Sequence, residues 1–116
     1  MIKNCKKILR ISAKLLPVDV EIIKIYMQGA VEGFCNCNPK DNLSVRILFG
    51  GNNRNWNETP MQKIYDYYIK IGKPEKDAAK SASIDAGKLL TSVLADNSRE
   101  FELVGKDSGN IYRLVL

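Results

Sequence analysis

The first sixteen residues carry cations and no acids, and gathered cations are the residue type that binds phosphate and other anions. The cations of this segment are Lys3, Lys6, Lys7, Arg10 and Lys14. Four of them recur at steps of three and four residues, which places them on one side of a helix: Lys3, Lys7, Arg10 and Lys14. We therefore expect an amphipathic helix over residues 1–16. Its basic side contacts a nucleic-acid backbone, an acidic protein or an anionic membrane surface, or is simply solvated while the apolar side packs on the core.

Residue types needed for catalysis or metal binding are sparse. The sequence has no histidine, which is the side chain that most often serves as general base near neutral pH or as metal ligand. The odd number of cysteines excludes a complete set of intramolecular disulfides, and the Cys35-x-Cys37 spacing is too tight for a zinc knuckle. Several carboxylates stand next to or near lysines, as is typical of solvated ion pairs: Asp41, Glu58, Asp66 and Asp85. We expect no enzyme, no metal site and no cofactor.

The composition is that of a globular chain with a single core. The 116 residues are 45% apolar and 27% charged, which suits one compact domain and excludes a disordered chain. No apolar run approaches the roughly 20 residues that a membrane span needs, and lysines interrupt the N-terminal stretch where a signal peptide requires a continuous apolar run. We expect a compact cytoplasmic protein with no membrane partner, with a helical region over residues 1–57 and a second region over residues 58–116.

The next expected element is a helix from Val18 to about Glu32, and Pro17 either closes the helix before it or opens this one. Its polar positions form only a narrow strip: Glu21, Lys24, Gln28 and Glu32. A helix that is apolar over most of its circumference is buried on several sides. We expect it to be the central helix of the fold or, as the alternative, part of a dimer interface. Gly33 to Asn42 follows as a turn-rich connection.

Residues 43–49 fit two kinds of element. Apolar residues at every second position favour a strand, whereas Asp41 or Asn42 as N-cap and Gly50 just past the end favour a short helix. We favour the helix. In the polar loop that follows, we expect Trp56 to fold back onto the core, because an exposed indole wastes its apolar area.

The C-terminal half shows clear boundaries. Thr59-Pro60-Met61-Gln62 has the pattern of a capping box with proline at the first helical position, and predicts a helix that ends at Gly72. The remaining expected elements are a short helix over Glu75–Ser81, a turn over Ser83–Asp85, a helix over Asp85–Ala95, a strand over Glu100–Gly105, a hairpin turn over 106–110 and a strand over Ile111–Leu116.

Three helices followed by a hairpin is the element order of a winged helix. Residues 58–116 resemble winged helix-turn-helix domains of the HARE-HTH type. Four short motifs carry this resemblance: Thr59-Pro60, Gly72-Lys73-Pro74, Ser98-Arg99-Glu100-Phe101 and Gly109-Asn110-Ile111-Tyr112-Arg113-Leu114. The fold class we expect is α+β, mainly α, with N-terminal helices packed on a winged-helix-like unit of three helices and a β-hairpin.

The resemblance implies DNA binding, in which the third helix enters the major groove and the hairpin touches phosphates. It implies that Asp85, Lys88, Thr91, Ser92 and Ala95 point outward, and that the hairpin offers Lys106 and Asn110, flanked by Arg99 and Arg113. Together with the N-terminal cations, the nucleic-acid contacts we expect are Lys3, Lys7, Arg10, Lys14, Lys88, Thr91, Ser92, Lys106 and Arg113.

Charge balance limits this expectation. Residues 59–116 hold nearly as many acids as bases, whereas a groove-reading domain usually shows a basic face. The N-terminal segment must therefore lie beside the third helix to supply affinity. We expect a small, non-catalytic nucleic-acid-binding accessory or regulatory protein of bacterial or phage type. The alternative is a protein-interaction or dimerisation adaptor without nucleic-acid contact, which uses the apolar second helix and the tyrosines Tyr65, Tyr67 and Tyr68.

Overall fold

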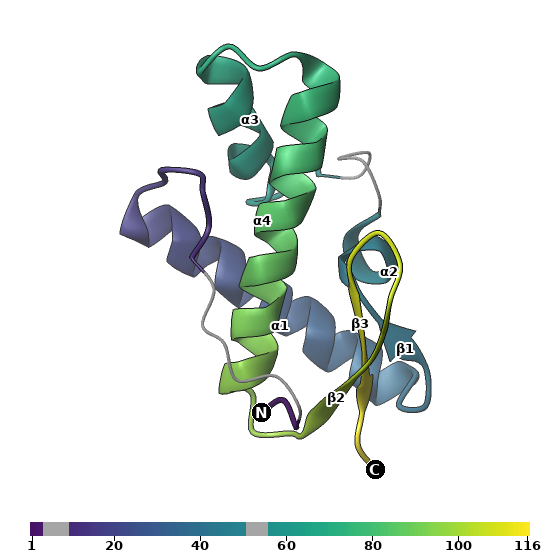
Figure 1. The fold of residues 1–116 in the computed structure, drawn as a ribbon. Helices are drawn as coiled ribbons and strands as arrows, with labels where there is room; N and C mark the ends of the chain where they lie inside the picture. Colours follow the sequence, from purple (N-terminus) through teal and green to yellow (C-terminus); the bar gives the residue numbers. More distant parts are fainter. Residues whose placement is uncertain (4–9, 51–55) are drawn as a thin grey trace.

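The computed structural model describes residues 1–3, 10–50 and 56–116 of the chain (Figure 1). The elements in chain order are α1 (Pro17–Cys37), β1 (Asn42–Leu43), α2 (Val45–Phe49), α3 (Gln62–Lys70), α4 (Glu75–Asp96), β2 (Phe101–Lys106) and β3 (Asn110–Leu114). The strands form an antiparallel sheet in the order β1-β3-β2. The fold class is α+β and mainly helical, as the sequence predicts.

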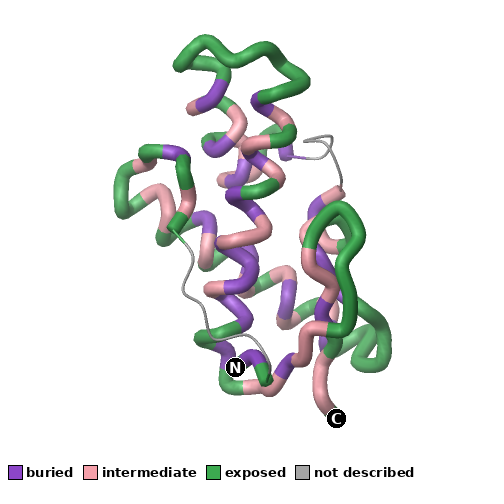
Figure 2. The backbone as a smooth tube through the Cα atoms, viewed as in Figure 1, coloured by how far each residue is buried: buried purple, intermediate pink, exposed green. Residues whose placement is uncertain are grey.

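The helix α4 forms the centre of the molecule. Figure 1 shows α3 beside its N-terminal half, α1 crossing its C-terminal half and the β2–β3 hairpin standing next to it. Buried residues run along α4 as a column (Figure 2). The predicted division into two helices with a turn over Ser83–Asp85 is wrong, so residues 58–116 contain two helices before the hairpin and not three. The helix continues because Ala78, Ala82 and Ala86 form one buried line through the expected turn.

The helix α1 is longer and less buried than predicted. Of the two roles left open for Pro17, the structure shows that it opens this helix. The helix continues past Glu32 to Cys37, because its buried side chains recur every four residues beyond the expected end. Those side chains are Ile23, Met27, Val31 and Cys35. The expectation that this helix is buried on several sides is wrong: α1 buries one line, and the opposite side is exposed.

The segment before α1 is not the helix expected over residues 1–16. Residues 4–9 lie outside the described part of the chain, and no helix is found on either side of them, over 1–3 and 10–16. Ile2 is buried and forms a parallel β-bridge with Phe101, with the N–H of Lys3 donating to the carbonyl of Phe101 at 2.7 Å. The N–H groups of Ser12 and Ala13 donate to Asp85. Contacts with residues far along the chain thus replace the local helical bonds.

The short helix α2 and the buried Trp56 confirm two predictions. The helix is present over 45–49 and ends at Gly50, which has φ 79°. Its N-cap is Ser44, whose hydroxyl accepts from the N–H of Ile47 at 3.2 Å, so the expected caps one turn earlier were wrong. Trp56 is 1% exposed and donates from Nε1 to the carbonyl of Phe49 at 3.1 Å. The indole therefore fixes the end of α2 to the core.

The capping box predicted over Thr59–Gln62, at the start of α3, does not form. The Thr59 hydroxyl donates to the carbonyl of Trp56 at 2.7 Å, and the Gln62 amide donates to Asp66 within α3. The helix begins at Gln62, after a turn in which the left-handed Glu58 (φ 63°) sets the chain direction. The predicted C-terminus is confirmed: Gly72 has φ 96°, and the N–H of Lys73 donates back to the carbonyl of Tyr68.

The hairpin matches its prediction within one or two residues, and its register decides which side chains face the helices. Leu103 pairs with Tyr112 and Glu102 with Arg113. Tyr112 is buried against α4, so its neighbour Arg113 points to the other face of the sheet. The short strand β1, which the sequence did not predict, pairs with β3 on its second edge.

Candidate functional site

A cleft of about 370 Å³ lies between α2, the middle of α4 and the tip of the β2–β3 hairpin. Its apolar surface comes from all three elements: Val45, Ile47, Ile84, Leu90 and Ile111. Ile47 is 50% exposed and Ile84 is 52% exposed, so the apolar surface is open to solvent. The volume falls in the range of small-ligand pockets.

Cations from three different elements line this cleft. They are Arg46 on α2, Lys88 on α4 and Lys106 at the end of β2. Among the described residues that line the cleft, Asp107 is the one acid, and it lies 3.8 Å from Arg46 in an exposed ion pair. The cleft therefore combines net positive charge with an apolar surface. The total charge of residues 59–116, which is close to neutral, does not predict this local excess of cations.

Consecutive hydrogen bonds connect β3 to α4 along one side of the cleft, and each hydroxyl in them donates to the next group. The Thr91 hydroxyl donates to the carbonyl of Gly87 at 3.0 Å, so its oxygen is left to accept from the Tyr112 hydroxyl at 2.7 Å. The Asn110 amide donates in turn to the Tyr112 hydroxyl at 3.2 Å. Thr91 is 3% exposed, so the expectation that it points outward to phosphate is wrong. Its hydroxyl joins the hairpin to α4.

The N-terminal segment passes along α4 close to the cleft. The Lys88 ammonium, which lines the cleft, donates to the backbone carbonyl of Arg10 at 3.3 Å. Arg10 and Lys14 are exposed. The structure therefore brings Arg10 next to Lys88, as the nucleic-acid expectation requires.

Asp85 holds this segment in place. Its carboxylate is 1% exposed and accepts from the N–H of Ser12 at 3.0 Å, from the N–H of Ala13 at 3.1 Å and from the Tyr68 hydroxyl. Burial, together with the neighbouring Asp85, raises the pKa of Tyr68. The expectation that Asp85 points outward from the third helix is wrong, because these three donors draw it into the core.

The other expected contact residues do not gather at the cleft. Lys3 lies beside Phe101, just past the C-terminal end of α4. Ser92 is half-buried on α4. Arg113 forms an ion pair with Glu102 at 2.8 Å on the face of the sheet that turns away from α4. Lys7 lies outside the described residues.

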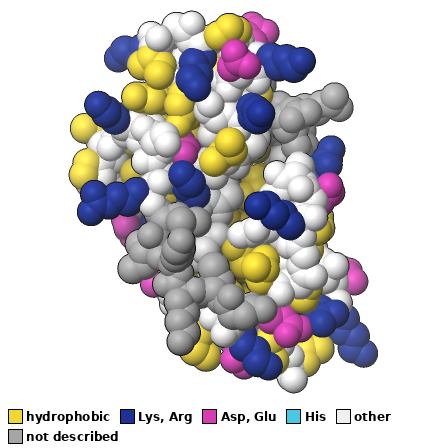
Figure 3. Space-filling model, in the orientation of Figure 1, with side chains coloured by type: hydrophobic (Ala, Val, Ile, Leu, Met, Phe, Trp, Pro, Cys, Tyr) yellow, Lys and Arg dark blue, Asp and Glu magenta, His cyan; other side chains and the backbone are white. Residues whose placement is uncertain are grey.

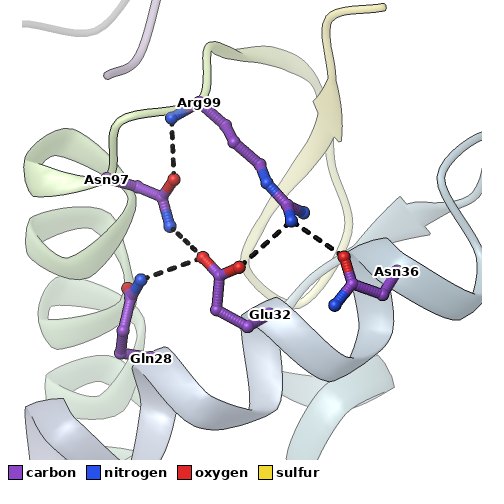
Figure 4. Close-up of polar contacts among 5 residues, drawn as sticks. All are labelled: Gln28, Glu32, Asn36, Asn97 and Arg99. Atoms are coloured by element: carbon purple, nitrogen blue, oxygen red, sulfur yellow. Dashed lines mark hydrogen bonds and ion pairs between the residues drawn. The ribbon is translucent and has the colours of Figure 1, made fainter.

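Arg99 is engaged in a polar cluster away from the cleft (Figure 4). Its guanidinium lies 3.1 Å from the Glu32 carboxylate and donates to the Asn36 amide oxygen at 2.8 Å. Glu32 also accepts from Gln28 and from Asn97, each at 3.1 Å. The cluster joins α1 to the connection between α4 and β2. Arg99, which was expected to flank the hairpin, instead connects α1 to the segment before β2.

Sequence reasoning missed Arg46. A single arginine in a five-residue helix gives no periodic signal, and only the packing of α2 beside the hairpin places it at the cleft. On the face drawn in Figure 3, most Lys and Arg side chains of the described residues stand apart from one another and form no continuous band.

Comparison with protein-family models, with curated proteins and with solved structures finds no match for this chain. In the part of the chain that the structure describes, no helix has the length and apolar character to cross a membrane. The same residues contain no group of three or more cysteines and carboxylates arranged to hold a metal ion.

Proposed function

We propose that the protein binds nucleic acid, as a non-catalytic accessory or regulatory protein of the cytoplasm, through the cleft between α4 and the hairpin. One observation carries the proposal: Lys88, Lys106 and Arg46, from three separate elements, line one cleft, and Arg10 lies next to Lys88. The hairpin that follows α4 and stands beside it supports the same function, since a wing follows the recognition helix in winged-helix proteins. The exposed free thiol of Cys37 fits a reducing compartment.

In this proposal the sugar–phosphate backbone crosses the mouth of the cleft. Lys106 contacts it from the hairpin, and Lys88 and Arg10 contact it from α4 and the N-terminal segment. Arg46 contributes less because Asp107 shares its charge. Three or four phosphate contacts predict moderate affinity, with the logarithm of the binding constant falling by roughly 0.9 per contact for each tenfold rise in salt.

The test measures the fluorescence anisotropy of a labelled 20-base-pair duplex and of a single strand of the same length, at NaCl concentrations from about 50 to 300 mM. The double variant Lys88→Glu/Lys106→Glu should lower affinity more than tenfold and reduce the salt slope by about 2. The matched control is Lys70→Glu/Lys76→Glu, which reverses two exposed lysines near the other end of α4 and should lower affinity less than threefold. Equal losses in the two variants, or no binding at the lowest salt, would contradict the proposal.

A second function is favoured by a different observation. The side of α1 opposite its buried line stays apolar in the folded chain, with Val18 59% and Ile25 65% exposed. We propose that this face serves contact with a protein, whether or not nucleic acid is bound. Such a contact persists in high salt because it buries apolar area, whereas contacts with phosphate weaken. The tyrosines named with the alternative function contribute little to this face, since Tyr68 is buried and Tyr65 and Tyr67 pack against the core. The test is chromatography on a hydrophobic resin, on which Ile25→Glu should elute earlier than the wild-type protein; equal retention contradicts the exposed face.

A further inference from the structure

The exposed side of α1 carries a regular line of large apolar side chains. Val18, Ile22 and Ile25 follow at steps of four and three residues and are 59%, 46% and 65% exposed. They lie on the side of the helix opposite the buried line that Ile23 and Met27 begin. A helix that is apolar on two opposite sides has one side left without a partner.

The same line continues toward the C-terminal end of α1 with glycines. Gly29 and Gly33 are exposed, and a Cβ atom added to either would meet nothing within 4 Å. The exposed side of α1 therefore has a bulky N-terminal half and a bare C-terminal half, where another helix can approach the backbone closely. Neither half places Lys, Arg, Asp or Glu on the line from Val18 to Gly29.

We propose that this face binds the α1 of a second copy of the chain, antiparallel, with the two-fold axis between Ile25 and Tyr26. In this register Val18 faces Gly33 of the second copy and Ile22 faces its Gly29. A symmetric dimer requires that residue i contact residue j while j contacts i. Here Val18 and Ile22 each meet a glycine, and Ile25 meets Tyr26 across the axis, so the sequence of the face is complementary to itself. This inference rests on the protein contact proposed above and names a second copy of the chain as its partner. It is independent of nucleic-acid binding.

The size of the face fits a weak dimer. Four large apolar side chains contribute, all between 38% and 65% exposed: Val18, Ile22, Ile25 and Tyr26. With large side chains offering roughly 150–200 Å² each, about half of that area is open, or roughly 350 Å² of apolar surface per copy. Including the glycine backbone and the polar edges, two copies bury about 1,000 Å² in total, the lower bound for a specific interface. An interface of this size is typical of weak, transient association, so we expect the dimer to form only at high protein concentration.

Two of the charged residues that flank the line are already engaged within one copy. Glu32 is held by Arg99 at 3.1 Å and directed toward the polar cluster, and Asp19 lies 2.7 Å from Lys63. Tyr26 is fixed by its ring contact with Phe49, with centroids 5.8 Å apart. The antiparallel arrangement also sets the positive N-terminal end of one helix dipole beside the negative end of the other.

The first test is sedimentation equilibrium of the full chain from about 5 to 500 μM. The wild-type protein should change from monomer to dimer over this range. Ile25→Glu should weaken association at least tenfold, because each copy then places one carboxylate near the two-fold axis. Ile71→Glu is the matched control, because Ile71 is 55% exposed just after α3, and it should leave association unchanged. A chain that stays monomeric throughout, or equal effects of the two variants, overturns the proposal.

The second test checks the register by disulfide formation. In a background with Cys5 and Cys37 replaced by serine, one chain carries Ile22→Cys and another carries Gly29→Cys. A mixture of the two should form a mixed disulfide under mild oxidation at least five times faster than either chain forms one with itself. Equal rates overturn the proposed register.

Failure of this inference is distinct from failure of either proposed function. A monomeric wild-type chain that is still retained longer than Ile25→Glu on a hydrophobic resin has an open face whose partner is not a second copy. Equal retention of the two shows that the face itself is closed. Binding of a labelled 10-base-pair duplex, which has room for one copy, is scored separately and should be unchanged by Ile25→Glu.

Discussion

The Tyr68 hydroxyl donates a hydrogen bond to the carboxylate of Asp85, seventeen residues further along the chain, and both side chains are buried. The same carboxylate accepts from the N–H groups of Ser12 and Ala13. One acidic side chain thus fastens three segments to one another: α3, the middle of α4 and the N-terminal segment that carries Arg10. The position of the basic segment beside the cleft depends on this carboxylate.

Removing the carboxylate should destabilise the fold strongly. Asp85→Ala leaves three donors without their acceptor, and two of them, the N–H of Ala13 and the Tyr68 hydroxyl, are buried. Each unsatisfied buried donor costs about 1–3 kcal/mol, so we expect a loss of about 2 kcal/mol or more in the free energy of unfolding, measured by urea denaturation. Asp41→Ala, in the exposed loop before β1, is the control and should change stability by less than about 0.5 kcal/mol. A loss below about 1 kcal/mol for Asp85→Ala would show that these hydrogen bonds are not what holds the segment.

Because the pKa of Tyr68 is raised in the folded protein, its contribution to the free energy of unfolding should decrease at high pH. Burial, reinforced by Asp85, raises the pKa of this hydroxyl above its ordinary value of 10.0. The unfolded chain then loses the proton at lower pH than the folded chain, so the Tyr68 contribution is complete below about pH 10 and is lost as the pH rises further. The urea midpoint of the wild-type protein should fall more between pH 9 and pH 11 than that of Tyr68→Phe. Parallel curves for the two proteins would contradict this.

Thr91 and Ser92 are neighbours on α4 that should differ in how much each contributes to stability. The Thr91 hydroxyl lies in the hydrogen-bond chain from Asn110 through Tyr112 to the Gly87 carbonyl. Thr91→Val breaks this chain and leaves the Tyr112 hydroxyl without its acceptor, so we expect a loss of about 1–2 kcal/mol in unfolding free energy. Ser92→Ala, at the half-buried neighbouring position, should change stability by less than about 0.5 kcal/mol. Equal stability of the two variants would exclude the structural role of Thr91.

The sequence predicted those elements that depend on local signals. Gly72, with φ 96°, ends α3 where the glycine suggested. The hairpin follows from two short apolar runs around the turn at 106–110. Trp56 is buried because the polar loop around it offers no other apolar surface to cover its large indole, which therefore packs on the core. In each case the deciding interaction lies within a few residues of the signal.

The features that the sequence did not predict depend on distant partners. Residues 10–16 have a helical pattern, but the carboxylate of Asp85, more than seventy residues away, takes the N–H groups of Ser12 and Ala13. Ser83 and Asp85 suggested a turn because such side chains often cap helices. Asp85 is instead occupied by donors from other segments, so nothing ends α4 there. Two cations of the cleft, Lys88 and Lys106, were predicted from the sequence as contact residues. Arg46 was not, because only the packing of α2 beside the hairpin places it at the cleft.

Arg99 provides the last prediction, because the sequence placed it among the residues flanking the hairpin and the structure places it between α1 and β2 (Figure 4). Its ion pair with Glu32, at 3.1 Å, is supported by hydrogen bonds from Gln28 and Asn97 to the same carboxylate. A double-mutant cycle with Arg99→Ala and Glu32→Ala should give a coupling energy of about 1 kcal/mol, since a hydrogen-bonded network holds both charges. The more isolated pair of Arg113 and Glu102 should give less than about 0.5 kcal/mol.

The same variant distinguishes a structural arginine from one that contacts phosphate. Arg99→Ala should leave the affinity for the labelled duplex within twofold of the wild-type value at about 100 mM NaCl, and the salt slope unchanged, because its guanidinium is already paired on the α1 side of the molecule. Lys106→Ala, a cation of the cleft, should lower the affinity threefold or more and the slope by about 1. A reduced slope for Arg99→Ala, with normal unfolding free energy, would move the nucleic-acid contact away from the cleft and toward the base of the hairpin.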